Sequence, residues 1–324
     1  MTKQTTETHK APGRHYRKGM TLAELFAKFP NDAAAEAWFA EVRWAGKPEC
    51  PHCGHDSIQH PTTHPTMPYR CRGCRRFFSV RTDSVMADSK LGYQTWAIAV
   101  YLFNTGIKGT SAMKFHRDLG TAYSTAWHLA HRIRKAYDTR TREADPFLGP
   151  VEADETAVGQ KARTMHAAKR RERIHGRGMV DKTIVAGVKD RNSGQVAATV
   201  VERTDRATLQ GFVRSHSGED AMVYTDDHGA YIGLPHHATV RHSVGEYVDG
   251  MAHVNGIESF WALMKRGLHG TYHQVSPKHL DRYVQEFAGR HNTRPLDTDK
   301  QMEHTAANMV GKRLQYAELV AEPV

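Results

Sequence analysis

The sequence contains few cysteines, no long apolar run and fewer acidic than basic side chains. Only four cysteines occur among 324 residues, and they form two close pairs, which excludes a network of disulfides spread along the chain. The longest apolar run, Trp96–Phe103, is too short to span a bilayer. Residues 1–20 are polar and basic and lack the apolar segment of a secretory signal. We therefore expect a soluble intracellular protein.

The charge balance favours a polyanionic partner. Lys and Arg total 45 against 35 Asp and Glu, a formal net charge of +10, and 22 histidines can add further positive charge. A surplus of this size favours nucleic acid first and an anionic membrane second. The length allows two or more domains, and the sequence shows no internal repeat or low-complexity tract.

The cysteines are spaced as a metal site. Cys50 and Cys53 form one C-x2-C pair, Cys71 and Cys74 form another, and 17 residues separate the pairs, which predicts a zinc ribbon with one Zn²⁺ held by four thiolates. Disulfides or free thiols are the alternative. Four nearby histidines are expected to be spectators: His52, His55, His60 and His64. Four flanking arginines favour DNA contact: Arg70, Arg72, Arg75 and Arg76. We expect the ribbon to dock nucleic acid or protein, and a purely structural role is the alternative.

Helical patterns lie on both sides of the ribbon. Residues 21–45, with Thr21 as a cap, and 93–103 are predicted to be helical. Residues 109–120 and 123–137 predict two helices joined at a glycine, the pattern of a helix-turn-helix. The second helix is predicted to pack through one stripe and to expose a polar and basic face of Ser124, Thr125, His128, His131, Arg132 and Lys135. An ordinary helical hairpin with a solvated basic face is the alternative.

The pattern changes to strands after the proline-containing linker at 145–150. The predicted strands and helices follow in this order: strands 149–158, 183–189 and 195–202, helix 204–214, strands 221–225 and 238–242, helices 255–268 and 277–291. This is the element order of an RNase H-like α/β domain. Acids on the first strand, at the end of the fourth and on a late helix converge at one sheet edge in that fold.

Three acids occupy those positions: Asp154, Asp226 and Glu258. Carboxylates without Cys or His ligands suit Mg²⁺ or Mn²⁺, and two such ions can promote in-line phosphodiester cleavage. Lys265 follows Glu258 by two helical turns, so it shares the Glu258 face and is expected to hold a DNA phosphate. Asn255 lies one helical turn before Glu258 on the same face, and it is expected to contact DNA or orient a carboxylate. Three neighbouring acids are alternates: Glu152, Glu155 and Asp227. Strand alternation puts Glu152 on the Asp154 face and Glu155 on the other.

Basic residues flank the predicted acids. The expected DNA contacts from the segment after the first strand are Lys161, Arg163, Lys169, Arg170, Arg171 and Arg173. A solvated charge run is the usual explanation of such a cluster, but proximity to a phosphodiester site favours phosphate neutralisation. Further expected DNA contacts are Arg132 and Lys135 on the helix 123–137, and Lys265 and Arg266 on the late helix.

These motifs together resemble a known family. The four-cysteine ribbon, VEADETAVGQK from Val151, VYTDDHGAY from Val223, the long run HVNGIESFWALMKRGLHGTYHQVSPKHLDRYVQEF from His253 and RHNTR ending at Arg294 are similar to transposases of the IS1595 family, ISXO2-like group. One departure is Gly159-Gln160-Lys161, where a Gly-Gly-Lys sequence is expected; it leaves the acids intact.

The resemblance implies a DDE-type transposase that cuts and joins insertion-sequence ends carrying terminal inverted repeats. It implies Mg²⁺ or Mn²⁺ at Asp154, Asp226 and Glu258, with Lys265 as the accompanying basic residue, and leaves Asn255 as a second candidate for the third catalytic role. Implied partners are transposon-end and target DNA and at least one further copy of the chain on DNA, in the cytoplasm, associated with the bacterial nucleoid.

The expected domains follow from these assignments. They are an N-terminal helical segment (1–45), the zinc ribbon (46–82), a helix-turn-helix-like DNA-binding region (90–140), the RNase H-like catalytic domain (148–295) and a C-terminal tail (296–324). Two alternative functions share these features: a catalytically silent zinc-ribbon DNA-binding regulator and a structure-selective RNase H-fold nuclease. Intact acids argue against the first, and strand-transfer products would separate the transposase from the second.

Overall fold

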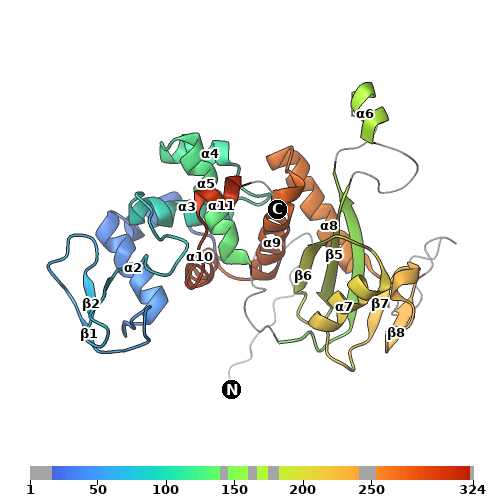
Figure 1. The fold of residues 1–324 in the computed structure, drawn as a ribbon, viewed down its shortest axis with the longest axis horizontal. Helices are drawn as coiled ribbons and strands as arrows, with labels where there is room; N and C mark the ends of the chain where they lie inside the picture. Colours follow the sequence, from blue (N-terminus) through green and yellow to red (C-terminus); the bar gives the residue numbers. More distant parts are fainter. Residues whose placement is uncertain (1–16, 139–144, 160–165, 174–181, 241–252, 322–324) are drawn as a thin grey trace, which may run out of the picture. The chain divides into compact units, whose positions relative to one another are not determined.

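The computed structural model describes residues 17–138, 145–159, 166–173, 182–240 and 253–321 (Figure 1). The chain divides into two compact units. Met1–Ala136 and Thr293–Glu322 form one, which we call the ribbon–helix unit, and Tyr137–Asn292 form the other, which we call the sheet unit. None of the helices in these described ranges is long and apolar enough to cross a membrane.

The ribbon–helix unit begins with two short helices, α1 (Leu22–Lys28) and α2 (Asp32–Trp44). The Thr21 side chain accepts the backbone N–H of Glu24, and the Glu24 carboxylate accepts that of Thr21, so the predicted cap is present as a capping box. The ribbon follows as three short antiparallel strands, β1 (Ile58–Gln59), β2 (Tyr69–Cys71) and β3 (Phe77–Phe78), in the order β1-β2-β3.

An aromatic cluster joins the ribbon to α2. The rings of Trp44 and Tyr69 lie 5.0 Å apart edge to face, and those of Tyr69 and Phe78 stack at 5.4 Å. A ribbon of this size buries little apolar surface of its own, so this packing adds stability that the strands alone cannot supply.

The remaining helices of this unit are α3 (Tyr93–Thr105), α4 (Ala112–Leu119), α5 (Tyr123–Tyr137), α10 (Thr298–Ala307) and α11 (Tyr316–Val320). The helices expected from residues 93–103, 109–120 and 123–137 are thus confirmed, and α4 ends at Gly120, whose φ of +63° suits glycine. After residue 295 the sequence predicted only a tail. The structure instead shows α10 packed against α2 and α3.

The exposed face predicted for α5 is only partly present. Ser124 and Thr125 are exposed, whereas His131 and Arg132 are buried. The Arg132 guanidinium donates to the carbonyls of Leu314 and Ala87, so a C-terminal segment covers this part of the helix. The expectation that Arg132 faces solvent is therefore wrong, because its guanidinium group is buried and makes internal hydrogen bonds. Contact of Arg132 with DNA stays a prediction, which this burial disfavours.

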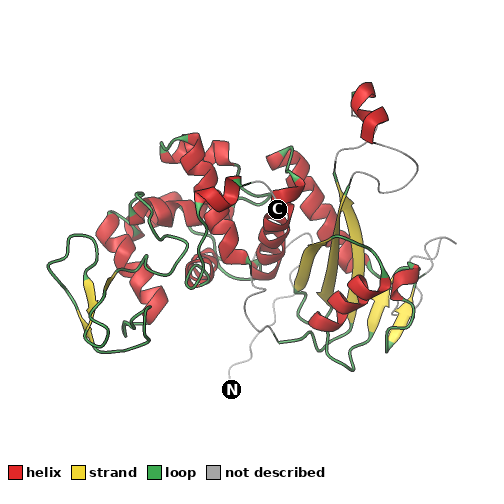
Figure 2. Cartoon of the chain, viewed as in Figure 1, coloured by secondary structure: helices red, strands yellow, loops and turns green. Residues whose placement is uncertain are grey.

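The described residues of the sheet unit form one five-stranded sheet, with helices packed on it (Figure 2). Its strands are β4 (Val151–Val158), β5 (Thr183–Asp190), β6 (Val196–Val201), β7 (Val223–Thr225) and β8 (His237–Thr239), in the order β6-β5-β4-β7-β8. β4, β5 and β6 pair antiparallel, whereas β7 and β8 run parallel to β4. The ends of β4, β5, β6 and β7 lie within two residues of the predicted ends. β8 overlaps the predicted strand 238–242.

Helices cover both faces of this sheet. α7 (Arg206–His216) packs on one face against Val151, Ala153 and Val188. α8 (Asn255–Gly267), its π-helical continuation η4 (Leu268–Tyr272) and α9 (Pro277–Thr293) pack on the other, against Val185 and Val196. The alternation of β-strand side chains sends successive residues of β4 to opposite layers. The mixed α/β architecture expected from the sequence is confirmed.

Candidate active site and metal centre

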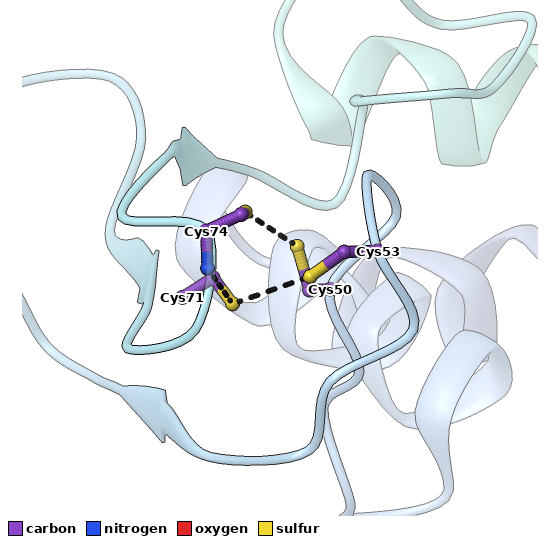
Figure 3. A group of neighbouring side chains, drawn as sticks. All are labelled: Cys50, Cys53, Cys71 and Cys74. Atoms are coloured by element: carbon purple, nitrogen blue, oxygen red, sulfur yellow. Dashed lines mark hydrogen bonds between the residues drawn. The ribbon is translucent and has the colours of Figure 1, made fainter.

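The four cysteines meet at one point of the ribbon (Figure 3). Their sulfur atoms all lie within 4.8 Å of one another, with Cys50 Sγ 3.6 Å from Cys74 Sγ and Cys53 Sγ 3.7 Å from Cys71 Sγ. Sulfurs about 3.8 Å apart are what a tetrahedral ion with Zn–S bonds of about 2.3 Å requires. The thiol set therefore fits Zn²⁺, as the spacing predicts.

The neighbouring histidines have other contacts. The His60 ring stacks on Tyr69 at 4.2 Å, and the His64 ring lies 5.1 Å from Phe77. His55 Nδ1 accepts the backbone N–H of Ser57. The cluster of potential ligands contains only cysteines. Burial raises the pKa of Cys50 to about 12, so a metal that binds its thiolate must displace a proton.

Asp154 and Asp226 come together at the end of the parallel strand pair. Val151 of β4 lies opposite Val223 of β7, so Asp226, directly after β7, occupies the position that corresponds to Asp154. Burial raises the pKa of Asp154 to about 7, and the negative charges of Asp226 and Glu155 act in the same direction. The register of the two strands thus places Asp154 and Asp226 side by side, and Glu155 is the neighbour of Asp154 along β4.

Asp154 is a partly buried acid without a cationic hydrogen-bond partner. Its Oδ2 accepts the indole N–H of Trp261 at 2.9 Å, and no ion pair to its carboxylate is present within the described ranges. Burying a carboxylate beside another one is costly unless a cation compensates. The Asp154 and Asp226 pair thus has the donor chemistry and the unbalanced charge expected of a site for Mg²⁺ or Mn²⁺.

The other residues predicted for the site lie on α8. The Lys265 side chain is half-buried; burial lowers its pKa, and Asp154 opposes this shift, which places the ammonium near that acid. Glu258 and Asn255 are exposed. Asp226 and Glu155 are the negative charges that act on Asp154, and Glu258 is not among them. In the part of the chain that the structure describes, no group of potential metal ligands includes Glu258, so the structure does not bring it together with the two aspartates.

A network that was not expected from the sequence fixes the start of α8. Glu152, 2% exposed, accepts the Ile257 backbone N–H at 2.8 Å and Nε of Arg191 at 2.9 Å. The Arg191 guanidinium in turn lies 4.0 Å from the centre of the Tyr224 ring. Glu152 therefore takes the place of a side-chain cap at this helix end. Strand alternation predicted that Glu152 lies on the Asp154 face. The sequence pattern could not predict that it would bind the Ile257 N–H and Arg191.

Trp261 is a second unexpected contributor. Trp261 is buried on the packing face of α8, with its ring against Gly187. Its indole N–H nevertheless reaches Asp154. The N–H group of a buried tryptophan usually has a hydrogen-bond acceptor. This rule is the signal in the sequence that could have suggested a polar partner for Trp261.

The residues predicted to contact DNA differ in solvent exposure, and several lie outside the described part of the chain. Arg171 on α6 (Ala167–Arg173) and Arg266 on α8 are exposed, and Lys135 is half-buried. Lys161 and Arg163 lie outside the described residues, as do the side chains of Lys169, Arg170 and Arg173. Asp227, an alternate for Asp226, is exposed.

Comparison with known proteins identifies two domains. Residues 146–292 match the ISXO2-like transposase domain, and residues 30–76 match the transposase zinc-ribbon domain. An uncharacterized protein in transposable element ISH50 of Halobacterium salinarum is 28% identical over 274 residues, which cover 80% of this chain and 90% of that protein. No solved structure gives a significant match. The chain thus has an ISXO2-like transposase domain preceded by a transposase zinc ribbon.

Proposed function

We propose that this protein is a DNA transposase that cuts insertion-sequence ends at their terminal inverted repeats and joins them to target DNA. The observation that carries the proposal is the approach of Asp154 and Asp226 at the end of the β4–β7 pair within an ISXO2-like transposase domain. The net charge of +10 suits a polyanionic substrate.

The strand order supports an RNase H-like fold for the sheet unit. Three antiparallel strands, with β4 at the centre of the sheet, are followed by two strands parallel to β4 on its other side. α7 lies on one face, and α8 and α9 lie on the other. In that fold, acids on the first strand, after the fourth strand and on a late helix act together, and we assign these roles to Asp154, Asp226 and Glu258.

Asp154, Asp226 and Glu258 would hold Mg²⁺ or Mn²⁺. The bound ions would activate the attacking oxygen and stabilise the leaving oxygen of a phosphodiester. The chain's own groups prepare this chemistry. The Trp261 indole N–H fixes Oδ2 of Asp154, and Lys265 would offer its ammonium group to a phosphate beside the acids.

The geometry of α8 favours Glu258 over Asn255 for the third catalytic role. Trp261 is the residue of this helix that reaches Asp154. At about 100° per residue, Glu258 lies roughly 60° around the helix from Trp261, and Asn255 roughly 120°. Lys265, at about 40°, is already close to Asp154 electrostatically, so Glu258 is on the side of the helix that faces the acids.

The pair α4–α5 is proposed to read the transposon end as a helix-turn-helix-like element. The N-terminal part of α5 is exposed at Tyr123, Ser124 and Thr125. Residues at this end of a recognition helix are those that contact base edges in known helix-turn-helix complexes. The buried C-terminal half, with Arg132, serves to attach the helix to its own unit.

The test compares Asp226→Asn with its neighbour Asp227→Asn, an adjacent and exposed aspartate of the same chemistry. Zinc-loaded full-length protein is incubated with inverted-repeat DNA and Mg²⁺, and cleavage and strand-transfer products are counted. Loss of one metal ligand should reduce cleavage by at least roughly 100-fold in Asp226→Asn. Asp227→Asn should stay near wild type. Equal cleavage by wild type and Asp226→Asn would contradict the site. Cleavage without strand transfer would favour a nuclease, and specific binding without cleavage a silent regulator.

A further inference from the structure

A buried acid next to the proposed metal site has no part in the chemistry described above. Glu155 follows Asp154 on β4, and its side chain is 7% exposed. It points to the opposite face of the sheet, where its Oε2 accepts the hydroxyl of Tyr231 at 2.8 Å. Tyr231 is itself buried, with 1% of its surface exposed, within the core beneath α7.

Tyr231 belongs to the same loop as Asp226. It ends the short helix η2 (Gly229–Tyr231), five residues after the aspartate. The loop between them is internally ordered, because the His228 backbone N–H donates to Asp226 Oδ1 at 3.1 Å and the Tyr231 N–H donates to the His228 carbonyl at 3.1 Å. A shift of Tyr231 would therefore carry Asp226 with it.

The Tyr231 hydroxyl links this loop directly to β4, the strand that bears Asp154. When both aspartates are ionised they repel each other, and this repulsion acts to separate the loop from the strand. The hydrogen bond between Tyr231 and Glu155 acts in the opposite sense. His228 adds to it, since its Nδ1 lies 3.8 Å from Glu155 Oε1.

We propose that Glu155 is a positioning residue of the active site, which holds the Asp226 loop against β4 through the hydroxyl of Tyr231. The inference rests on the proposed function in one respect: it takes Asp154 and Asp226 as the metal-binding pair. Preorganised ligands bind a cation more tightly because no ordering is needed when the ion arrives.

Substitutions can separate this role from direct metal binding by Glu155. A glutamine at 155 retains an oxygen that accepts the tyrosine hydroxyl but loses the charge. A positioning role therefore predicts that Glu155→Gln stays close to wild type while Tyr231→Phe and Glu155→Ala fail alike. A metal-ligand role predicts that Glu155→Gln fails like Glu155→Ala while Tyr231→Phe is mild.

The matched control is Tyr224→Phe. Tyr224 lies on β7, two residues before Asp226, and its described contact is through the ring, over which Arg191 lies. Phenylalanine keeps that ring. The control thus removes a tyrosine hydroxyl close to the site without touching the link to Glu155.

Two measurements use the zinc-loaded full chain without DNA. Mn²⁺ binding is followed by electron paramagnetic resonance, and amide hydrogen exchange is followed over residues 226–234 without added metal. Tyr231→Phe should weaken Mn²⁺ binding about tenfold, the equivalent of one buried hydrogen bond to a charged acceptor. Exchange in the loop should be faster than in wild type and in Tyr224→Phe. Glu155→Gln keeps an acceptor for the Tyr231 hydroxyl and should match wild type in loop exchange. Its Mn²⁺ affinity should fall less than that of Tyr231→Phe, because the link is kept and only the charge is lost.

Unchanged exchange and unchanged Mn²⁺ affinity in Tyr231→Phe would overturn the proposal. So would a Glu155→Gln protein as impaired as Glu155→Ala. If Glu155→Ala does not fold, Tyr231→Phe and Glu155→Gln still decide the question. If wild type cleaves no DNA but Tyr231→Phe loosens the loop, the proposed function fails and the positioning role stands.

Discussion

At the residue scale, the carboxyl group of Asp154 links stability to metal binding. Burial, Asp226 and Glu155 raise its pKa to about 7, so the folded metal-free protein keeps a proton that the unfolded chain has released. The folded state then binds more protons than the unfolded state between the ordinary value of 3.8 and about 7. Stability of the metal-free protein falls across this window as the pH rises.

We expect Mg²⁺ to reverse that trend. In zinc-loaded protein without Mg²⁺, the melting temperature should decrease from pH 5 to pH 7.5, and stabilisation by added Mg²⁺ should grow over the same range as the proton leaves Asp154. Asp154→Asn has no proton to lose at this position and should show a flatter profile and little response to Mg²⁺. A metal-free profile identical in wild type and Asp154→Asn would show that this carboxyl group does not control the behaviour. Differential scanning calorimetry at several pH values, with and without Mg²⁺, measures the melting temperatures of wild type and Asp154→Asn.

Single residues also show where sequence reasoning reaches its limit. The positions of Asp154 and Asp226 followed from strand order, because parallel neighbours end at the same edge of a sheet. Alternation correctly sent Glu152 and Glu155 to opposite faces. It could not reveal that Tyr231 would meet Glu155, since that contact depends on how a loop 76 residues away returns to the strand. Non-local partners of this kind leave no periodic signal.

At the element scale, α8 depends on a close approach between its first turn and β4. A Cβ atom on Gly256 would lie 2.6 Å from Oε2 of Glu152 and 2.6 Å from Nζ of Lys189. Glycine therefore lets Glu152 reach the Ile257 N–H and anchor the helix that carries Glu258 and Lys265.

Gly256→Ala should accordingly destabilise the protein by about 1–3 kcal/mol, the range found when extra atoms are forced into packed sites. Gly211→Ala in α7 is the matched control, because a Cβ there meets nothing within 4 Å. Alanine in an open helix position should instead stabilise by about 0.5–1 kcal/mol. Urea denaturation of both variants measures the difference. Equal effects at the two glycines would mean that the anchor does not constrain α8.

The ribbon segment around the second cysteine pair, Cys71 and Cys74, carries exposed positive charges that could contact DNA. Arg72, Arg75 and Arg76 are exposed, and no ion pair to them occurs among the described residues. If each contacts one phosphate, replacing all three by alanine should reduce the slope of log affinity against log salt by about three for duplex DNA. Zinc content should stay at one per chain. Fluorescence anisotropy with inverted-repeat DNA at several salt concentrations gives the slope, and an unchanged slope would leave the ribbon a purely structural role.

The spacing of apolar residues predicted where helices and strands begin and end better than it predicted which of their side chains are buried. α5 begins and ends where the pattern placed it, yet its polar face proved half covered, because helical spacing tells which residues share a side but not whether a later segment lies on it. That covering segment comes from beyond residue 295, where low amphipathicity gave no reason to expect packed helices. The C-terminal residues complete the ribbon–helix unit rather than extending from it.

At the scale of the whole molecule, the proposed function assigns DNA recognition to one compact unit and cleavage to the other. Each has its own internal contacts, with the cysteine cluster in the ribbon–helix unit and the acids in the sheet unit. Small zinc modules bury little apolar surface and derive much of their folding free energy from the metal. Zinc loss should therefore disturb the first unit and leave the second folded.

Cys71→Ser tests this division, since it removes one of four ligands and leaves the sheet unit intact. The full-length variant should contain well below one zinc, and hydrogen exchange should rise in residues 47–82 but not in β4, β5 or β6. Preference for inverted-repeat DNA over unrelated DNA should fall by an order of magnitude or more, as is typical when specific contacts are lost and phosphate contacts remain. Mg²⁺-dependent nicking of unrelated plasmid should persist, because Asp154 and Asp226 are untouched. Full inverted-repeat preference in zinc-free protein would show instead that recognition resides outside the ribbon, and loss of all nicking with an unchanged sheet unit would show that zinc binding and catalysis are coupled across the chain.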